Sequence, residues 1–264
     1  MEKIERKYYK NGQLKIECYF KNNSYHRKNG PAIICYYESG NKEVEYWYEN
    51  GIPHRHNKPA SISYFPNNRI EKEVYYLNGV LHRTNGPAKI CYYENGSIKS
   101  EQYYINGKIH RENGPAIICY YDNGNKENEK WFYYDEIHRS DGPAVIYYYK
   151  NGSIEDETWY KSNMLHREGG PALIRYDKNG NIVEEKYYFN GKLHRENGPA
   201  VIYYYKNGQK KLERWYCNEF FHNLNGPAEI YYEEDGTITS KKYYINGKLM
   251  DELQIEVLKS LKKV

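Results

Sequence analysis

Hydrophobic and polar positions alternate along most of this chain in short stretches that are separated by Asn-Gly pairs. Between residues 88 and 111, for example, aromatic and aliphatic residues lead up to Asn95-Gly96, and a second such stretch leads up to Asn106-Gly107. Asn-Gly pairs flanked by strand-forming residues are the strongest short-range sign of a β-hairpin. The pattern therefore predicts strands on both sides of each of these turns.

The same pattern returns every 28 residues, and each full unit begins with a histidine. These histidines are His26, His54, His82, His110, His138, His166, His194 and His222. Residues 1–25 form a partial unit, and eight full units occupy residues 26–249. A fixed internal period indicates an architecture in which neighbouring units bury one another. We therefore expect an all-β fold, an elongated antiparallel array of β-hairpins.

The last segment, residues 250–264, has a helical period instead. Met250, Leu253, Val257, Leu261 and Val264 recur at steps of three and four residues, which predicts an amphipathic helix. Acidic residues at its start and lysines near its end suit the helix dipole. We expect this helix to cap the last repeat, because the end of a repeat array needs a cover. A helix that binds a partner or a membrane surface is the alternative.

Turns of two residues would fix the register of the strands, with Ile90 opposite Glu101, Tyr92 opposite Lys99, and Tyr103 opposite His110. One face of the sheet would then carry Ala88, Ile90, Tyr92, Glu101, Tyr103 and His110, and the other would carry Cys91, Tyr93, Ile98, Gln102, Tyr104 and Arg111. The first set hardly varies between units, so we expect it to form the packed face.

Histidine and glutamate are the repeated residues with the most chemical potential. The repeated glutamates are Glu45, Glu73, Glu101, Glu129, Glu157, Glu185 and Glu213, and Lys241 ends the series. A catalytic site needs one constellation rather than eight copies, so we interpret the histidines as structural, each hydrogen-bonded to a glutamate. Histidines of adjacent units would lie about 10–14 Å apart, since strands are spaced by about 4.8 Å. This is too far for a shared metal, and we expect neither a metal nor another cofactor.

An arginine follows the histidine in seven of the eight units: Arg27, Arg55, Arg83, Arg111, Arg139, Arg167 and Arg195. The predicted register puts them on the variable face, beside Tyr76, Tyr104, Tyr160, Tyr188 and Tyr216. They could brace the sheet by stacking on these rings. Alternatively, they could form a basic, aromatic stripe for an acidic partner, phosphoinositide head groups or single-stranded nucleic acid.

Some units depart from the pattern. The unit at 54–81 has His56, and Lys58 in place of glycine, while the segments 134–137, 162–164 and 217–223 replace Asn-Gly turns. The last of these adds Phe220 and Phe221. Either drift or recognition of a specific partner would explain these departures.

Composition and charge limit the functions and the cellular compartments that suit this chain. The chain has 264 residues, a formal net charge of +4, and 34 tyrosines. This charge is too even to indicate nucleic-acid binding by itself. The chain has five cysteines, an odd number, and a charged N-terminal segment. Free thiols in a reducing, cytosolic compartment fit this better than a disulfide framework.

The stretch from Tyr92-Tyr93 through Asn95-Gly96 to Tyr103-Tyr104 and Asn106-Gly107 resembles the MORN-type repeat. It is closest to the variant in bacterial antitoxins of the YwqK type. The His-Arg-x-Asn-Gly-Pro-Ala extension is similar to repeat proteins of giant DNA viruses of amoebae. The resemblance covers about residues 5–249 and implies an antiparallel hairpin array that serves as a scaffold or binding surface.

No phosphate loop, nucleophile elbow or Cys-x-x-Cys pair is present. We therefore expect a non-enzymatic scaffold that binds a macromolecular partner, and a protein first of all. An antitoxin-like neutraliser is the most concrete version. A homo-oligomer formed through a sheet edge or the terminal helix, and binding of nucleic acid or acidic lipid, are the alternatives. An enzyme that uses His54, His56 and Lys58 is the rival class.

Overall fold

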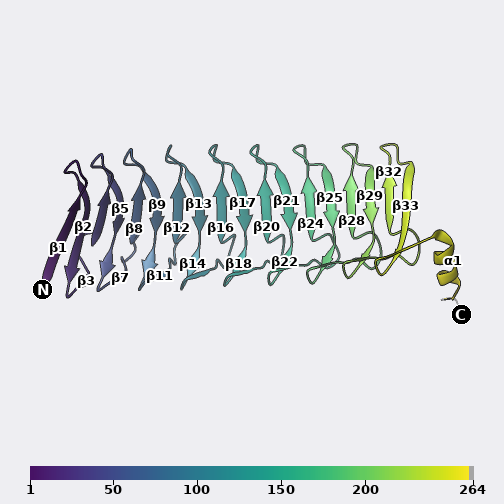
Figure 1. The fold of residues 1–264 in the computed structure, drawn as a ribbon, viewed down its shortest axis with the longest axis horizontal. Helices are drawn as coiled ribbons and strands as arrows, with labels where there is room; N and C mark the ends of the chain where they lie inside the picture. Colours follow the sequence, from purple (N-terminus) through teal and green to yellow (C-terminus); the bar gives the residue numbers. More distant parts are fainter. Residues whose placement is uncertain (262–264) are drawn as a thin grey trace. The chain divides into compact units, whose positions relative to one another are not determined.

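The computed structural model describes residues 1–261, and nearly all of their regular structure is β-strand (Figure 1). The chain divides into two compact units, Met1–Asp135 and Glu136–Val264. Within each unit, a full repeat contributes two long strands and then a short two-residue hairpin. The prediction of an antiparallel, all-β hairpin array that ends in a helix is confirmed.

In the first unit the long strands pair antiparallel in chain order. They are β1 (Glu2–Tyr8), β2 (Leu14–Lys21), β4 (Ile33–Tyr36), β5 (Lys42–Tyr46), β8 (Ser61–Tyr64), β9 (Ile70–Val74), β12 (Lys89–Tyr92), β13 (Ile98–Gln102), β16 (Ile117–Tyr120) and β17 (Lys126–Lys130). The short strands are β3 (Ser24–Tyr25), β6 (Tyr48–Glu49), β7 (Ile52–Pro53), β10 (Tyr76–Leu77), β11 (Val80–Leu81), β14 (Tyr104–Ile105), β15 (Lys108–Ile109) and β18 (Phe132–Tyr133).

The second unit repeats this order. Its long strands are β20 (Val145–Tyr148), β21 (Ile154–Thr158), β24 (Leu173–Tyr176), β25 (Ile182–Lys186), β28 (Val201–Tyr204), β29 (Lys210–Arg214), β32 (Glu229–Tyr232) and β33 (Ile238–Ile245). The shorter elements are β19 (Glu136–Ile137), β22 (Tyr160–Lys161), β23 (Met164–Leu165), β26 (Tyr188–Phe189), β27 (Lys192–Leu193), β30 (Tyr216–Cys217), β31 (Phe220–Phe221), β34 (Lys248–Met250) and the helix α1 (Glu252–Leu261).

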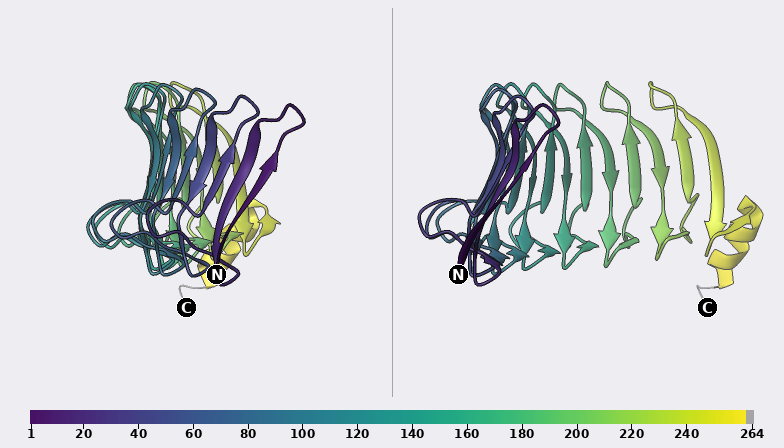
Figure 2. Two further views of the ribbon diagram at one scale, coloured as in Figure 1. Left: turned by 90° about the vertical axis from the view of Figure 1, so that its left-hand side faces the viewer. Right: turned by 60° about the vertical axis from the view of Figure 1, so that its left-hand side comes forward.

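The long strands have two distinct faces. Ile90 on β12 lies opposite Glu101 on one side and Glu73 on the other, so the predicted pairing of Ile90 with Glu101 is correct. The loops that join each short hairpin to the next long strand project to one side of the strands (Figure 2). We call this side the loop face, with Ile90 and Glu101 on it. The opposite side, which carries Cys91 and Gln102, is the open face.

The core lies on the loop face, where each loop returns to the sheet. The alanine of every Gly-Pro-Ala or Lys-Pro-Ala segment has at most 1% of its surface exposed. These residues are Ala32, Ala60, Ala88, Ala116, Ala144, Ala172, Ala200 and Ala228. The Ala88 carbonyl accepts the Tyr75 N–H at 2.7 Å. Only a small side chain fits so close to the neighbouring backbone, and this explains why alanine recurs.

The two Asn-Gly turns of a repeat are different structures. At Asn106-Gly107 both residues have positive φ, 51° and 80°, as in a type I′ turn, so the two-residue turn is confirmed there. At Asn95-Gly96 only the glycine has positive φ, and the pairing shifts so that Tyr92 lies opposite Ile98 rather than Lys99. That part of the predicted register is wrong, because a bulge with glycine in the left-handed region closes this turn.

The helix α1 begins with a capping box. Asp251 Oδ1 accepts the Gln254 N–H at 2.8 Å, and Gln254 Oε1 accepts the Asp251 N–H at 3.1 Å. Ile255 is the buried side chain of the helix, with 1% exposed, whereas Leu253 and Val257 are 70% and 52% exposed.

The apolar face predicted from Met250, Leu253 and Val257 is therefore wrong. Tyr243 on β33 donates a hydrogen bond to Glu252 Oε1 at 2.6 Å, and this contact together with the cap turns the Ile255 side of α1 toward the protein. The side chain of Leu261 and residues 262–264, which the sequence places in the same helix, lie outside the described part of the chain.

Candidate functional site

The repeated histidines hold each repeat to the following one. His82 Nδ1 accepts the backbone N–H of Asn106, in the type I′ turn 24 residues later, at 3.1 Å. The same bond occurs at His26, His54, His138, His166 and His222, with distances of 3.1–3.4 Å. The predicted hydrogen bond between histidine and glutamate is therefore wrong, because Nδ1 accepts a bond from a turn instead. The alternation of the long strand ends before the histidine, and a short hairpin lies between that strand and the histidine.

The repeated glutamates are held by tyrosines of the following repeat. Tyr92 donates to Glu73 Oε2 at 2.8 Å, and Tyr120 donates to Glu101 Oε2 at 2.9 Å. Equivalent bonds hold Glu45, Glu157, Glu185 and Glu213. Burial, and then the bond to Glu73, raise the pKa of Tyr92 above its usual range. The tyrosine therefore stays protonated and remains a donor at all physiological pH values.

The arginines lie on the loop face and not on the open face, so their predicted placement beside Tyr104 is wrong. The Arg111 guanidinium stacks on the Tyr103 ring at 3.9 Å. Arg27, Arg55, Arg83, Arg167 and Arg195 stack in the same way, at 3.8–3.9 Å, on the aromatic ring eight positions earlier. Its Nη1 donates to the Pro115 carbonyl at 3.2 Å. A Cβ on Gly114, where φ is +137°, would lie 3.2 Å from Arg111 Cζ. Glycine thus makes room for an arginine that folds back over its own loop.

Asn223 stands in the arginine position of the last full repeat. Its Nδ2 donates to the Pro227 carbonyl at 2.8 Å, the same carbonyl position that the arginines bind. The shorter side chain preserves the loop bond without the ring contact. This explains why the arginine series can end there without loss of the loop conformation.

The segments that replace Asn-Gly still form a turn, but the hydrogen bond from that turn to the histidine of the preceding repeat is weakened or lost. Asp135, Asn163 and Glu219 have positive φ in the glycine position. Asp135 Oδ1 and Asn163 Oδ1 each accept a backbone N–H of the preceding repeat at 2.8 Å. Among the described histidines, the Nδ1 atoms of His110 and His194, whose partner turns contain Asp135 and Glu219, are buried without a hydrogen-bond partner.

His110 has a different contact in exchange. Its ring stacks on Tyr134 at 4.1 Å with an interplanar angle of 8°. Tyr134 occupies the asparagine position of the altered turn. This position shows that an irregular turn is accommodated by local aromatic packing rather than by a new reactive site.

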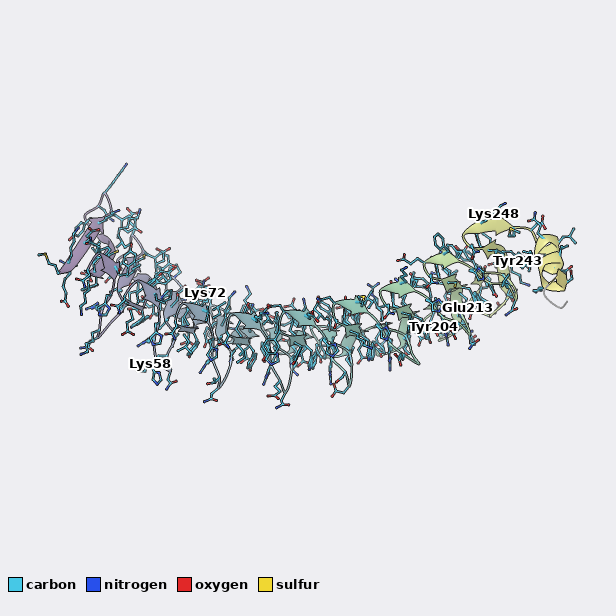
Figure 3. The ribbon with its side chains drawn as sticks, turned by 90° about the horizontal axis from the view of Figure 1, so that it is seen from below. Lys58, Lys72, Tyr204, Glu213, Tyr243 and Lys248 are labelled. Atoms are coloured by element: carbon cyan, nitrogen blue, oxygen red, sulfur yellow. The ribbon has the colours of Figure 1, made fainter. Side chains whose placement is uncertain are left out.

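The open face carries a row of aromatic rings, one per repeat. In the first unit these are Phe20, Tyr48, Tyr76, Tyr104 and Phe132, and in the second they are Tyr160, Tyr188, Tyr216 and Tyr244. Tyr104 donates to Gln102 Oε1 at 3.2 Å, which places its ring on this face. The rings are half-buried, and Lys72 and Lys58 lie on opposite sides of the sheet (Figure 3). No described element covers the open face in either unit.

The open face of the second unit also holds a charged cluster that the sequence analysis did not single out. Glu184 is bound by Arg175 at 2.9 Å and by Lys186 at 2.6 Å, and Glu229 is bound by Arg214 at 2.8 Å. The two carboxylates are only 3% and 5% exposed as side chains, but Arg175 is 52% exposed.

The pKa values in this cluster follow from burial and ion pairing. Burial acts to raise the pKa of Glu184, but hydrogen bonds from Lys186 and Tyr203 outweigh it and lower the pKa. Burial raises the pKa of Asp156 on the neighbouring strand, and Arg175 only partly offsets it. The sequence signal was Arg175, at a position that holds cysteine, serine or tyrosine in the other full repeats.

No three histidine, cysteine or acidic side chains of residues 1–261 are grouped so that they could hold a metal ion. The one helix that is described there is too short and too polar to cross a membrane.

Comparison with known families gives a match to the MORN repeat variant at residues 1–22 and 89–106. Both segments contain the hairpin of two long strands that the sequence resemblance pointed to, and the match supports a MORN-type repeat protein. The finer resemblance to YwqK-type antitoxins and to repeat proteins of giant viruses remains a prediction. No curated protein matches the chain.

Solved structures similar to this chain include alternansucrase in complex with isomaltononaose, at 17% identity over 87% of this chain and with a TM-score of 0.19. The TcdB2-TccC3 structure is similar at 11% identity over 94% of this chain, with a TM-score of 0.21. The chain spans only 16% and 14% of the length of these two proteins. Such low scores carry no conclusion about function.

Proposed function

We propose that this protein is a non-enzymatic repeat scaffold that binds a protein partner through the open face of its sheet. The observation that carries the proposal is the contrast between the two faces. The loop face is filled by the bonds that join the repeats, whereas the open face presents half-buried aromatic rings that no described element covers. Aromatic side chains are the commonest anchors of protein–protein interfaces.

The engagement of the repeated polar residues supports a non-enzymatic role. The histidine, glutamate and arginine side chains of the central repeats bind the turn, the tyrosine and the loop carbonyl of their own or the next repeat. One catalytic site needs one constellation of groups, whereas these bonds recur from repeat to repeat. Each arginine is also bonded to a carbonyl of its own loop, which supports a part in holding the loop rather than a stripe for nucleic acid or acidic lipid.

The finer form of the proposal is an antitoxin-like role, in which the scaffold neutralises one particular protein. The charged cluster around Glu184 and Arg175 would supply the selectivity, since the aromatic row alone is nearly the same in every repeat. Exposed arginine beside buried carboxylate is a surface that one complementary partner fits better than others.

The test is a pull-down from native host cells with matched variants. Tyr76→Ser with Tyr104→Ser alters the open face, and Tyr133→Ser alters a tyrosine that is 60% exposed and contacts His110 instead. We expect the open-face variant to lose the partner while the control keeps it, with unchanged circular dichroism in both. Equal capture by both variants would contradict the open face as the binding surface.

The same preparation separates the rival classes. Binding of the purified partner that weakens steeply as salt rises would favour nucleic acid or acidic lipid over protein. A chemical turnover that disappears on replacement of His54, His56 or Lys58 would favour the enzyme. The mass of the protein in solution, measured alongside, reports any self-association.

A further inference from the structure

The charge of the loops changes along the chain in a way that the repeat itself does not require. The residue after the arginine position is Lys28, His56, Thr84, Glu112, Ser140, Glu168, Glu196 and Leu224 in successive full repeats. Lys58 also replaces a glycine in the second of these loops. At the position after the arginine, basic residues therefore occur only in the first two loops, and three of the later loops have a glutamate there.

Two hollows flank the first loop. One, of about 230 Å³, lies between the first and second loops and is lined by Arg27, Lys28 and Arg55 with Glu49 as its single carboxylate. The other, of about 420 Å³, lies on the opposite side of the first loop. It is lined by Lys3, Lys21, Arg27 and Lys28, with Glu2 as its single carboxylate. Cations outnumber carboxylates in both hollows, although Lys3 is also paired with Glu5.

The donors in these hollows are held in fixed positions. Arg27 stacks on the Tyr19 ring at 3.8 Å and uses Nη1 on the Pro31 carbonyl at 3.3 Å, which leaves its other N–H groups without a partner among the described residues. His26 Nδ1 accepts the Asn50 N–H at 3.2 Å. Neutral His26 therefore carries its proton on Nε2, as a further donor. Preorganised donors bind an anion at a low entropic cost.

A hollow of the same construction in the second unit lacks the charge. It has about 450 Å³ and is lined by Arg167 and Arg195, but also by Glu168 and Glu196. The lining cations and carboxylates there are equal in number. This hollow serves as an internal comparison, because equivalent loops line it without a surplus of positive charge.

We propose that the first two loops bind a short acidic segment of a protein, with two carboxylates three residues apart. The two hollows lie one repeat apart, which is two strands or roughly 9.6 Å at the usual spacing of strands. Three residues of a polyproline II segment span about 9.3 Å, and residues three apart lie on the same side of such a segment. One carboxylate would enter each hollow, and Lys28 would lie between them. The hollows share Phe20 and Tyr48 with the aromatic row of the open face. The peptide assay uses Lys28→Glu, whereas the pull-down uses Tyr76→Ser with Tyr104→Ser, so the failure of this proposal and the failure of the proposed function can be distinguished.

A peptide fits the two hollows better than a nucleic acid does. Strong nucleic-acid binding needs a run of cations that neutralises many phosphates. Here the surplus of positive charge is local to the linings of the two hollows, and each lining also contains one carboxylate, Glu49 or Glu2. A peptide with two separated carboxylates places its charge only where the cations are.

Fluorescence anisotropy of labelled nine-residue peptides with the full chain tests the proposal. One peptide carries two glutamates three residues apart, a second carries them adjacent, and a third has glutamines instead. Lys28→Glu alters the site, and Lys206→Glu makes the same change of charge at an exposed position of the second unit. We expect the spaced peptide to bind tightest, and Lys28→Glu to weaken it by about tenfold or more, as the loss of a charged contact predicts. Lys206→Glu should change it less than about twofold.

Three results would overturn the proposal. The first is equal weakening of peptide binding by Lys28→Glu and Lys206→Glu, which would mean that binding depends only on the net charge of the chain. The second is equal binding of the spaced and adjacent peptides, which would remove the two-hollow geometry. The third is tighter binding of a short thymidine oligonucleotide of matched charge, or of inorganic phosphate, which would make the site a phosphate site. Circular dichroism confirms that each variant is folded.

Discussion

At the scale of single residues, the repeated polar side chains form bonds within and between repeats. His82 binds the turn of the following repeat, Glu73 accepts a hydrogen bond from Tyr92, and Arg111 closes its own loop. Each bond satisfies a polar atom that the neighbouring repeat would otherwise bury unpaired. Residue types that usually indicate catalysis therefore indicate stability in this chain.

The tyrosine–glutamate bond gives a direct prediction. Replacing Tyr92 by phenylalanine leaves the half-buried Glu73 carboxylate without its donor, and we expect a loss of about 1–3 kcal/mol in the free energy of unfolding. Tyr133→Phe, at a ring that is 60% exposed, should cost less than about 0.5 kcal/mol. Urea denaturation of both variants provides the measurement, and equal losses would contradict the role of the bond.

The charged cluster of the second unit predicts two opposite pH effects. The pKa of Glu184 is lowered in the folded protein, so its contribution to stability is present at neutral pH and is lost as the pH falls through the folded pKa. The pKa of Asp156 is raised, so its contribution is present at low pH and is lost as the pH rises through the folded pKa.

We therefore expect Glu184→Gln to lower the Tm at pH 7, and this deficit to shrink as the pH falls through the folded pKa of Glu184. Asp156→Asn should raise the Tm at pH 7, and this gain should shrink as the pH falls below the folded pKa. Thermal melts between pH 3 and pH 7 measure both. A Glu184→Gln deficit that grows at low pH would show that the assigned pKa direction is wrong.

At the scale of elements, the type I′ turn is the least stable part of a repeat when it lacks glycine. Glu219 has a φ of 75°, in a region that costs a residue with a Cβ about 1 kcal/mol. The partner turn of His194 is this one, and His194 Nδ1 is buried without a bond. The replacement of glycine by Glu219 thus strains the backbone of the turn, and the same turn leaves His194 Nδ1 without a hydrogen bond.

Glu219→Gly should stabilise the protein by about 0.5–1 kcal/mol, because the strain is relieved. Asp135→Gly serves as the matched control. It relieves the same strain but removes the bond from Asp135 Oδ1 to the Ile109 N–H, so its gain should be smaller or absent. Denaturation midpoints decide, and a larger gain for Asp135→Gly would refute the account.

The helix α1 is stabilised from one side by a single buried residue. Ile255→Ala should cost about 2–4 kcal/mol where the helix packs, since the side chain is almost fully buried. Leu253→Ala, with 70% of the residue exposed, should cost less than about 0.5 kcal/mol. Hydrogen exchange of the β33 and α1 amides locates the effect. Similar losses of stability for both variants would support the apolar helix face that was predicted from the sequence, with Leu253 packed against the protein.

At the scale of the whole molecule, the residues that join repeats change where the series ends. Lys241 replaces the repeated glutamate and is exposed, and Met250 stands in the position of the next histidine. The position that would hold a tyrosine bound to a glutamate at 241 is Ser260 in α1, and α1 rather than another long strand follows Met250. The bonds between repeats are therefore made only where a neighbour exists to complete them.

Contacts of this kind make stability a sum of local terms. Tyr92→Phe in the first unit and Tyr204→Phe in the second remove equivalent bonds, to Glu73 and to Glu185. We expect the double variant to lose the sum of the single losses to within about 0.5 kcal/mol. Chemical denaturation of the singles and the double checks this, and a coupling above about 1 kcal/mol would mean that the repeats do not act locally.

The sequence by itself determined the fold class and the repeat. Its period, the turn at Asn106-Gly107 and the pairing of Ile90 with Glu101 follow from local rules, because a two-residue turn and strand alternation act over a few neighbouring residues. The packed face was also predictable, since each copy of Ile90 must meet its own equivalents.

Only the tertiary structure decided which polar residues meet. The partner of Glu73 is 19 residues away and the partner of His82 is 24 residues away, across a loop whose path no alternation rule describes. Arg111 turned out to face its own loop, because the strand ends at Gln102 and the backbone then changes direction. The bulge at Gly96 and the Asp251 cap, which set the direction of the hairpin tip and of α1, likewise depend on bonds that form only once the chain is folded.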